Sequence, residues 1–408
     1  LDGRRDVLRQ AADALLPTVD ALTERMTREM GKPLREARGE VVHCIEGMRA
    51  LLDEQHAALS PDVLRDAHTV THRYRDPFGV AAVITPWNFP LMMPYQLVVA
   101  ALMAGNTVVL KPSEHTPLVA QDWVDVLQQH LPADVLHIVH GADATGRALV
   151  DAAVDLVAFT GSREVGMRIL ATAGAQLKRV VLELGGKDPM VVLSDADVAA
   201  AARFAARNAY RNAGQVCVST ERIYVDAAIA DAFEARFVEE AKAMTVGPGL
   251  APDTRVGPMI HAEQKAMVLA QVDEALADGA RLLLDQGRGE GCFLPPLALV
   301  DVRHDMRIMR DETFGPVACI QRVDGDDEAV RLANDTPFGL GAVVFGGDLD
   351  RAARVGRRLR AGMIGVNRAV GGAEGAPWVG AGQSGYGFHS GPEGHRQFAQ
   401  VRIVSLPA

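Results

Sequence analysis

The chain has 408 residues, of which 48% are hydrophobic and 23% charged, and its formal net charge is -10 at pH 7. At this length two or three packed units are expected, because one hydrophobic core rarely serves more than about 300 residues. Acidic and basic residues alternate without forming blocks, which argues against a nucleic-acid groove and against an anionic membrane surface as partner. No apolar run approaches the ~20 residues of a membrane helix, and no secretory leader opens the chain.

The four cysteines, Cys44, Cys217, Cys292 and Cys319, are widely spaced and form no C-x-x-C pair. This spacing predicts neither a metal site nor a disulfide framework, and it favours a reducing, cytoplasmic location. The chain begins at Leu1, almost directly in a helical pattern, so we expect that its N-terminus is truncated.

The first third of the chain begins with helical periodicity. Apolar residues recur at helical spacing from Asp6 to Met30, where Pro17 predicts a division into two helices and Gly31 a helix end. Pro33 is expected to open another helix. Residues 69–75 then alternate with period two, which predicts a half-exposed strand that projects from the body.

Short, valine-rich apolar runs follow at residues 80–84, 107–110, 135–139, 156–160 and 179–184, with helical patterns between most of them. This alternation predicts a parallel sheet covered by helices on both faces. Such sheets bind ligands at the carboxyl ends of their strands. The polar or glycine positions at these ends include Thr85, Trp87, Asn88, Lys111, Ser113, Glu114, Gly161, Ser162 and Glu183.

A second unit of the same kind begins after Gly186. Strands are predicted at residues 189–193, 222–225, 318–323 and 341–345, and helices at 196–211, 229–244 and 262–277. Residues 371–394 are rich in glycine and are predicted to be loop. Residues 398–406 alternate again and predict a second projecting strand. The fold class is therefore α/β, with two doubly wound units and a small β arm.

Two residues carry the candidate chemistry. Cys217 is by default a small buried hydrophobe, but Gly214 and Gln215 before it permit an unusual backbone approach, which makes it a candidate nucleophile. Glu183 ends an otherwise apolar strand, where a carboxylate is costly unless it has a partner or a role. Burial raises the pKa of a carboxyl group, which suits a general base near neutral pH. Asn88 either caps a turn or offers its amide N–H to an oxyanion.

Cofactor binding is suggested by two strand ends. Glu114 is either a solvated loop charge or a ligand for the ribose hydroxyls of an NAD adenosine. Gly161 and Gly166 bracket a strand-to-helix turn, where free N–H groups favour a phosphate. The run Gly380 to Gly385 fits G-x-G-x-x-G, but we reject it because neither the required strand nor the helix is predicted around it.

Eight motifs in order give the chain a family resemblance over essentially its whole length. They are Glu29–Pro33, Pro86–Pro90, Gly105–Asn106 with Lys111–Glu114, Phe159–Ser162, Leu182–Lys187, Gly214–Cys217, Glu312–Pro316 and Ser384–Gly387. With them the chain resembles the NAD(P)-dependent aldehyde dehydrogenase superfamily. Members of that family usually start several dozen residues earlier, in line with the expected truncation.

The resemblance implies oxidation of an aldehyde to a carboxylic acid. Cys217 would attack the carbonyl as a thiolate, and the Asn88 side chain with the Cys217 N–H would hold the oxyanion of the thiohemiacetal. After hydride transfer, Glu183 would activate the water that hydrolyses the thioester. The residues implied in cofactor binding are Glu312 and Phe314 at the nicotinamide ribose and ring, Lys111 and Glu114 at the adenosine ribose, Ser162 at the pyrophosphate, and Thr85, Trp87, Ser113, Gly161 and Leu184 around them.

The resemblance also implies three parts. These are a five-stranded cofactor domain at residues 1–58 and 79–185, a catalytic domain at 186–386, and an oligomerisation arm at 59–78 and 387–408. A homodimer or a homotetramer is expected.

Cofactor and substrate choice depend on a few positions. Glu114 would repel a 2′-phosphate, which favours NAD, although NADP is possible. Gln96 stands where succinic semialdehyde dehydrogenases carry a carboxylate-binding arginine, which counts against that substrate, but Arg368 could serve an acidic group. Met93, Val216, Val218 and Trp378 predict an apolar pocket for an aromatic or medium aliphatic aldehyde.

The late loop departs from the family pattern. Pro377–Gly382 replaces the usual glycine pair and lysine, and Phe388 and His389 stand where Arg-Glu is common. Two alternatives stay open: a CoA-acylating semialdehyde dehydrogenase, against which Glu183 argues because those relatives lack that base, and a catalytically silent structural homologue.

Overall fold

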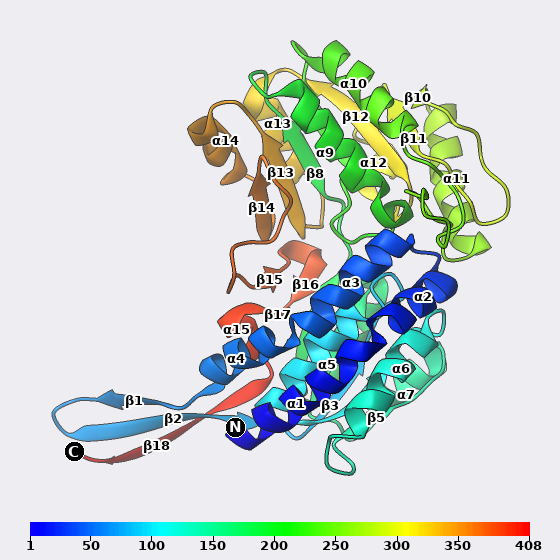
Figure 1. Ribbon diagram of the computed structural model, residues 1–408. Helices are drawn as coiled ribbons and strands as arrows, with labels where there is room; N and C mark the ends of the chain where they lie inside the picture. Colours follow the sequence, from blue (N-terminus) through cyan, green and yellow to red (C-terminus); the bar gives the residue numbers. More distant parts are fainter.

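Two open, mostly parallel β-sheets form the body of the computed structural model, which describes residues 1–408, and a three-stranded arm projects from it (Figure 1). The two sheets and the arm agree with the α/β class expected from the alternation of apolar runs and helices. None of the helices has the length and apolar character needed to cross a bilayer.

The first sheet has the strand order β16-β7-β6-β3-β4-β5. Five of its strands are parallel, as predicted, and their bounds are β3 Val80–Ile84, β4 Thr107–Lys111, β5 Leu136–Ile138, β6 Leu156–Gly161 and β7 Arg179–Leu184. The sixth strand, β16 Gly385–Tyr386, pairs antiparallel with β7. Its register sets Gly385 opposite Glu183, so the C-terminal part of the chain reaches the end of β7 that carries the expected base.

Helices cover both faces of this sheet, and the N-terminal helices lie along one side of it (Figure 1). They are α1 Asp2–Leu15, α2 Val19–Met30, α3 Leu34–Glu46, α4 Met48–Leu59, α5 Met92–Ala104, α6 Pro117–Gln128, α7 Asp143–Asp151 and α8 Arg163–Ala175. Pro17 divides α1 from α2 through a single 3-10 turn, Leu16–Thr18, and Gly31 ends α2 in the left-handed region at φ 83°. Gly47 divides the single helix expected after Pro33 into α3 and α4.

The second sheet has seven strands in the order β10-β11-β12-β9-β8-β13-β14, parallel except for β10. Their bounds are β8 Pro189–Val192, β9 Arg222–Asp226, β10 Arg281–Leu284, β11 Leu297–Val300, β12 Val317–Val323, β13 Gly341–Phe345 and β14 Met363–Val366. The helices of this unit are α9 Val198–Tyr210, α10 Ala230–Lys242, α11 Ala262–Ala277, α12 Arg307–Arg310, α13 Gly325–Asn334 and α14 Leu349–Gly356. The sequence analysis missed β10, β11 and β14, which are four-residue strands with little periodicity.

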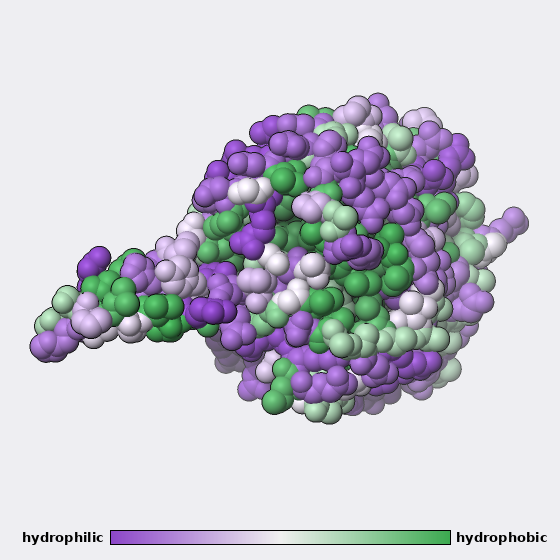
Figure 2. Space-filling model, turned by 90° about the horizontal axis from the view of Figure 1, so that it is seen from below, coloured by the Kyte–Doolittle hydropathy of each residue, from purple (hydrophilic) through white to green (hydrophobic).

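The arm joins two distant segments of the chain. It consists of β1 Asp62–Arg65, β2 Thr69–Pro77 and β18 Ala399–Pro407, and β18 pairs antiparallel with β2 over its full length. Figure 2 shows hydrophobic residues on its surface, and those exposed are Val63, Leu64, Val401, Ile403, Val404 and Leu406. The two projecting strands expected from sequence are therefore partners in one sheet.

Residues 371–394, predicted as loop, contain several short elements. These are β15 Trp378–Val379, the 3-10 turn Gly382–Ser384, β16, β17 Phe388–His389 and the start of α15 Gly391–Arg396. The prediction of a loop was wrong at these places because two-residue strands pair with distant or neighbouring backbone and leave no periodic pattern. We keep the three-part domain division as a proposal, with β16 adding a strand to the first sheet.

Candidate active site

The Cys217 segment has a strained backbone that begins where α9 ends. Asn212 and Ala213 have positive φ angles of 52° and 56°, and Gly214 follows at 71°. A Cβ atom on Gly214 would lie 2.0 Å from the carbonyl oxygen of Gly315, so only glycine fits between the two loops. The close backbone approach expected of Gly214 is therefore present, and it turns the chain sharply just before Cys217.

Amide side chains tie this segment to the one that contains Asn88. Asn212 Nδ2 donates to the carbonyl oxygens of Asn88 and Gln215, each at 3.2 Å. Asn88 Nδ2 also donates to the Gln215 carbonyl, at 3.1 Å. The amide of Asn88 is thus buried beside the backbone that leads into Cys217, and its role as an oxyanion donor stays a prediction.

One cavity, of about 720 Å³, brings most of the predicted residues together. The predicted residues on its wall are Trp87, Asn88, Met93, Gln96, Gly161, Ser162, Glu183, Leu184, Val216, Cys217, Val218, Glu312, Phe314 and Trp378. They come from the carboxyl ends of β3, β6 and β7, from the start of α5, from the Cys217 loop, from the loop before β12 and from β15. Both sheets and the C-terminal segment therefore contribute to one site.

The thiol and the carboxylate lie together in this cavity. Cys217 and Glu183 are close enough for each to shift the pKa of the other. Desolvation and then the Glu183 charge raise the pKa of the Cys217 thiol well above its ordinary value. Burial raises the pKa of Glu183 from 4.5 to about 7, against hydrogen bonds from Trp378 and Cys217 that lower it. At rest the thiol is protonated, and Glu183 lies where it can accept that proton.

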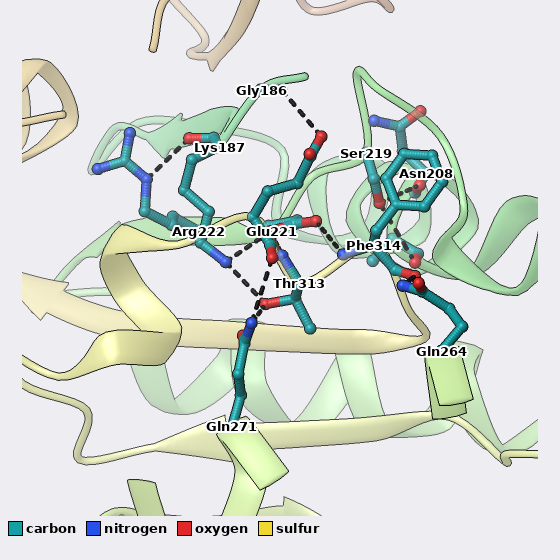
Figure 3. Close-up of polar contacts among 12 residues, drawn as sticks. Gly186, Lys187, Asn208, Ser219, Glu221, Arg222, Gln264, Gln271, Thr313 and Phe314 are labelled. Carbon is teal, nitrogen blue, oxygen red and sulfur yellow. Dashed lines mark hydrogen bonds and ion pairs between the residues drawn. The ribbon is translucent and has the colours of Figure 1, made fainter. Parts of the chain in front are cut away.

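A fully satisfied acid network lies behind the cavity wall (Figure 3). Glu221 accepts from Lys187 Nζ at 2.5 Å and from the backbone N–H groups of Thr313 and Phe314, each at 2.9 Å. Lys187 Nζ also donates to Thr313 Oγ1 at 2.8 Å. This network holds the Phe314 loop, and the Phe314 ring makes an edge contact with Trp87 at 5.4 Å between centroids.

Glu312, next to this network, lines the cavity and accepts a hydrogen bond from the Gly186 N–H at 3.0 Å. Burial, together with the charge of Glu221, raises the pKa of Glu312 to about 8. A half-buried acid of this kind on a cavity wall is suited to hydroxyl groups as partners.

The residues expected at a dinucleotide pyrophosphate fit an anion. Ser162 is the N-cap of α8, a helix of 13 residues, and its side chain makes no capping hydrogen bond. Gly161 and Ser162 line the cavity beside this helix start, where free N–H groups and the helix dipole favour a phosphate. This end of the cavity therefore fits the cofactor that the sequence suggested.

Four of the expected cofactor residues lie outside the cavity wall. Thr85 and Ser113 are buried, and Glu114 is exposed. Lys111 Nζ donates to the carbonyl oxygens of Pro112 and Gly141, at 2.9 and 2.8 Å, and lies 3.7 Å from Glu114. Their roles at an adenosine ribose stay predictions.

One expected pocket residue is not brought to the site. Arg368 is exposed after β14 and does not line the cavity, so its suggested contact with an acidic substrate stays a prediction without support from this placement. The cause is local: β14 ends at Val366, and Asn367 turns the chain at a φ of 52°.

Sequence reasoning missed several wall residues, among them His43, Arg211, His389 and Ser390. His389 Nδ1 lies 2.9 Å from Ser390 Oγ, which donates to Gln96 Oε1 at 3.1 Å. Burial, with a contribution from His395, lowers the pKa of His389 to about 4, so its ring is neutral. The available signal for these residues was the departure from the family pattern at Phe388 and His389. It marked the loop as unusual but did not show which of its side chains face the cavity.

The comparisons with known proteins agree with this geometry. The model of the aldehyde dehydrogenase family matches residues 1–404. A probable succinate-semialdehyde dehydrogenase [NADP(+)] from Sinorhizobium fredii (strain NBRC 101917 / NGR234) is 37% identical over 412 residues, which cover 99% of this chain and 84% of that protein.

Solved structures are similar over the same length. The aldehyde dehydrogenase of Brucella melitensis biovar abortus 2308 superposes with a TM-score of 0.95 at 35% identity, covering 99% of this chain and 85% of that one. Betaine aldehyde dehydrogenase from Staphylococcus aureus, solved in complex with NAD⁺, superposes with a TM-score of 0.94 at 31% identity, covering 99% and 82%. The protein therefore belongs to the aldehyde dehydrogenase family.

Proposed function

We propose that this aldehyde dehydrogenase uses Cys217 as nucleophile, Glu183 as general base and Asn88 as oxyanion donor, with NAD as hydride acceptor. The observation that carries the proposal is the contact between the Cys217 thiol and the buried Glu183 carboxylate inside one cavity. A thiol with a raised pKa needs a base to become a nucleophile, and Glu183 is in contact with it.

The chemistry follows from these three side chains. The thiolate of Cys217 forms a bond to the aldehyde carbon, and the Asn88 amide donates to the oxygen that becomes negative. NAD, when bound, accepts the hydride that leaves this carbon, which yields a thioester on Cys217. Glu183 passes the thiol proton to solvent and then takes a proton from water as the water oxygen attacks the thioester carbon, and the carbon–sulfur bond breaks to release the acid and the Cys217 thiolate.

Preference for NAD rests on Glu114, whose carboxylate would repel a 2′-phosphate; NADP stays possible, and the Sinorhizobium relative is named for it. The exposed apolar residues of the arm, such as Val401 and Ile403, support a homodimer or homotetramer. The four free cysteines support a reducing, cytoplasmic environment.

The wall of the cavity supports an aldehyde with an apolar body. Met93, Val216, Val218 and Trp378 are on this wall. Arg211 is also on it, with its guanidinium 5.6 Å from the Phe89 ring centroid, and its charge opposes the burial that raises the pKa of the nearby Glu36. We therefore extend the proposal to aldehydes whose far end is negatively charged, with Arg211 in the role first considered for Arg368.

The test measures NADH formation by absorbance across aromatic, aliphatic and acidic aldehydes, with NAD and NADP in parallel. Cys217→Ala is expected to lower the rate on the order of 10⁴-fold or more. Product analysis by mass spectrometry, with and without CoA, separates a free acid from an acyl-CoA. Formation of acyl-CoA would overturn hydrolysis, and an active Cys217→Ala protein would overturn the nucleophile.

A further inference from the structure

A short C-terminal segment places Trp378 against Glu183. The backbone of Trp378 pairs with His389 across β15 and β17, and Gly385 between them pairs with Glu183 itself on β7. The indole nitrogen Nε1 donates to Glu183 Oε1 at 3.3 Å. The same segment therefore pairs with the backbone of Glu183 and also contacts its side chain.

Glu183 has few other partners. Its side chain is buried, at 5% exposure, and the donors that reach its carboxylate are the Trp378 N–H and the Cys217 thiol. During turnover the thiol donor disappears, because the sulfur of a thioester carries no proton. Of these two donors, only the indole N–H then remains to hydrogen-bond the Glu183 carboxylate.

We propose that Trp378 is a positioning residue for the general base: its indole N–H holds the Glu183 carboxylate in place beside Cys217 while the thioester is hydrolysed. This inference rests on the proposed function, in which Glu183 activates water. It adds to the role expected of Trp378 in the wall of the aldehyde pocket.

The physical reason lies in the protonation of a buried acid. Burial favours the neutral carboxyl, and a hydrogen bond to the charged form opposes this effect. Of the hydrogen bonds that lower the pKa of Glu183, the one from Trp378 contributes most. An ionised, oriented carboxylate is what a general base requires near neutral pH.

The experiment uses p-nitrophenyl acetate, which acylates a thiolate without NAD. The Cys217 thiolate attacks the ester carbon and p-nitrophenolate leaves; water then attacks the thioester, Glu183 takes its proton, and acetate and the thiolate separate. The burst of p-nitrophenolate reports acylation, the steady-state rate reports deacylation, and intact-protein mass spectrometry reports the acyl-enzyme.

Trp378→Phe keeps an aromatic ring and removes the donor. We expect the burst to persist, the acyl-enzyme to accumulate and the midpoint of the deacylation–pH curve to rise by about one pH unit. Below pH 7 the steady-state rate should fall about tenfold, because about tenfold less carboxylate is ionised. A residue that only walls the pocket would alter KM and the burst and leave this midpoint unchanged.

The matched control is a double-variant cycle with Glu183→Gln. Because Trp378 acts through Glu183, the double variant should deacylate no more slowly than Glu183→Gln alone. The deacylation–pH profile of the double variant also reports Glu312, the titratable neighbour that remains in the acyl-enzyme. Thermal unfolding of each variant verifies that the fold is kept.

Two results would overturn the inference and differ in what else they remove. Suppose that Glu183→Gln deacylates slowly. An unchanged pH midpoint in Trp378→Phe, or additive losses of deacylation rate in the double variant, would then remove only the positioning role. Normal deacylation by Glu183→Gln would remove the base assigned in the proposed function and the inference with it.

Discussion

Two buried carboxylates near Cys217, Glu183 and Glu221, have opposite surroundings. Glu221 accepts from an ammonium and two backbone N–H groups, all within 2.9 Å. Glu183 accepts from an indole at 3.3 Å and a thiol. A saturated carboxylate can only hold its donors together, whereas an undersaturated one keeps lone pairs for a substrate proton. The comparison separates a structural acid, Glu221, from the proposed general base, Glu183.

The largest expected effect distinguishes the two acids by rate. Glu183→Gln should slow hydrolysis of the thioester about 10²–10⁴-fold, since it removes the base and leaves the nucleophile in place. Rapid-quench measurement of the acyl-enzyme, followed by its decay, provides the rate. Thiol labelling of Cys217 in the same variant serves as the control for an intact site. An acyl-enzyme that decays at the parent rate would contradict the assignment.

Breaking the hydrogen-bonded network around Glu221 should instead lower the free energy of unfolding. Lys187→Met leaves the Glu221 charge buried without its ammonium partner, which should lower the free energy of unfolding by about 3–5 kcal/mol. Urea unfolding measures this change.

The matched control for that variant is an exposed pair. Arg147 and Asp143 form an ion pair of 2.7 Å with both side chains more than half exposed, at 64% and 60%. Arg147→Met should cost at most about 1 kcal/mol. Equal losses in the two variants would show that burial and saturation of Glu221 have no special weight.

The pH dependence of stability should carry the signature of Glu183. Its pKa is raised in the folded protein from 4.5 to about 7, so between these values the folded state binds more protons than the unfolded state. This contribution therefore lowers stability as pH rises from 4.5 to 7, by up to about 3 kcal/mol, and is constant above. The difference in unfolding free energy between Glu183→Gln and the parent protein should grow in favour of the variant over this range. A difference that does not vary with pH would contradict the raised pKa.

The smallest expected effect concerns the outer shell of the saturated network. Gln271 Oε1 accepts from Thr313 Oγ1 at 2.8 Å, and Gln271 Nε2 donates to the Glu312 carbonyl at 3.2 Å. Gln271→Leu removes both bonds and should lower stability by about 1–2 kcal/mol. Differential scanning calorimetry measures the loss, and Gln271→Glu, which keeps the acceptor for Thr313, should recover part of it. No loss in Gln271→Leu would show that these bonds are replaced by water.

Much of the fold followed from local pattern. The strands at 80–84, 179–184 and 341–345 agree with β3, β7 and β13 at both ends, and α11 has its predicted bounds. These elements have strong periodicity or continuous apolar runs, which depend only on neighbouring residues. The four-residue strands β10, β11 and β14 escaped prediction although β8, of the same length, was predicted, so length alone does not explain the difference.

The candidate site divides in the same way. The identities of Cys217, Glu183 and Asn88 were readable from motifs, and the structure brings all three to one cavity. Arg368 and Trp378 were both predicted as pocket residues from their place in a loop, but only Trp378 lines the cavity, where it donates to Glu183, and Arg368 is exposed. A loop has no periodicity that states which side chains face inward, so only packing decides between them.

By itself the sequence determined the α/β class, the main alternation of strands and helices, the family and the candidate residues for acyl transfer, because these depend on local periodicity and on short motifs. Only the tertiary structure decided which distant segments meet. Pairing of β16 with β7 joins Gly385 to Glu183, and pairing of β18 with β2 completes the arm. These contacts join residues about 200 or more positions apart, and their register is set by the cooperative burial of whole faces, which no local window of sequence contains.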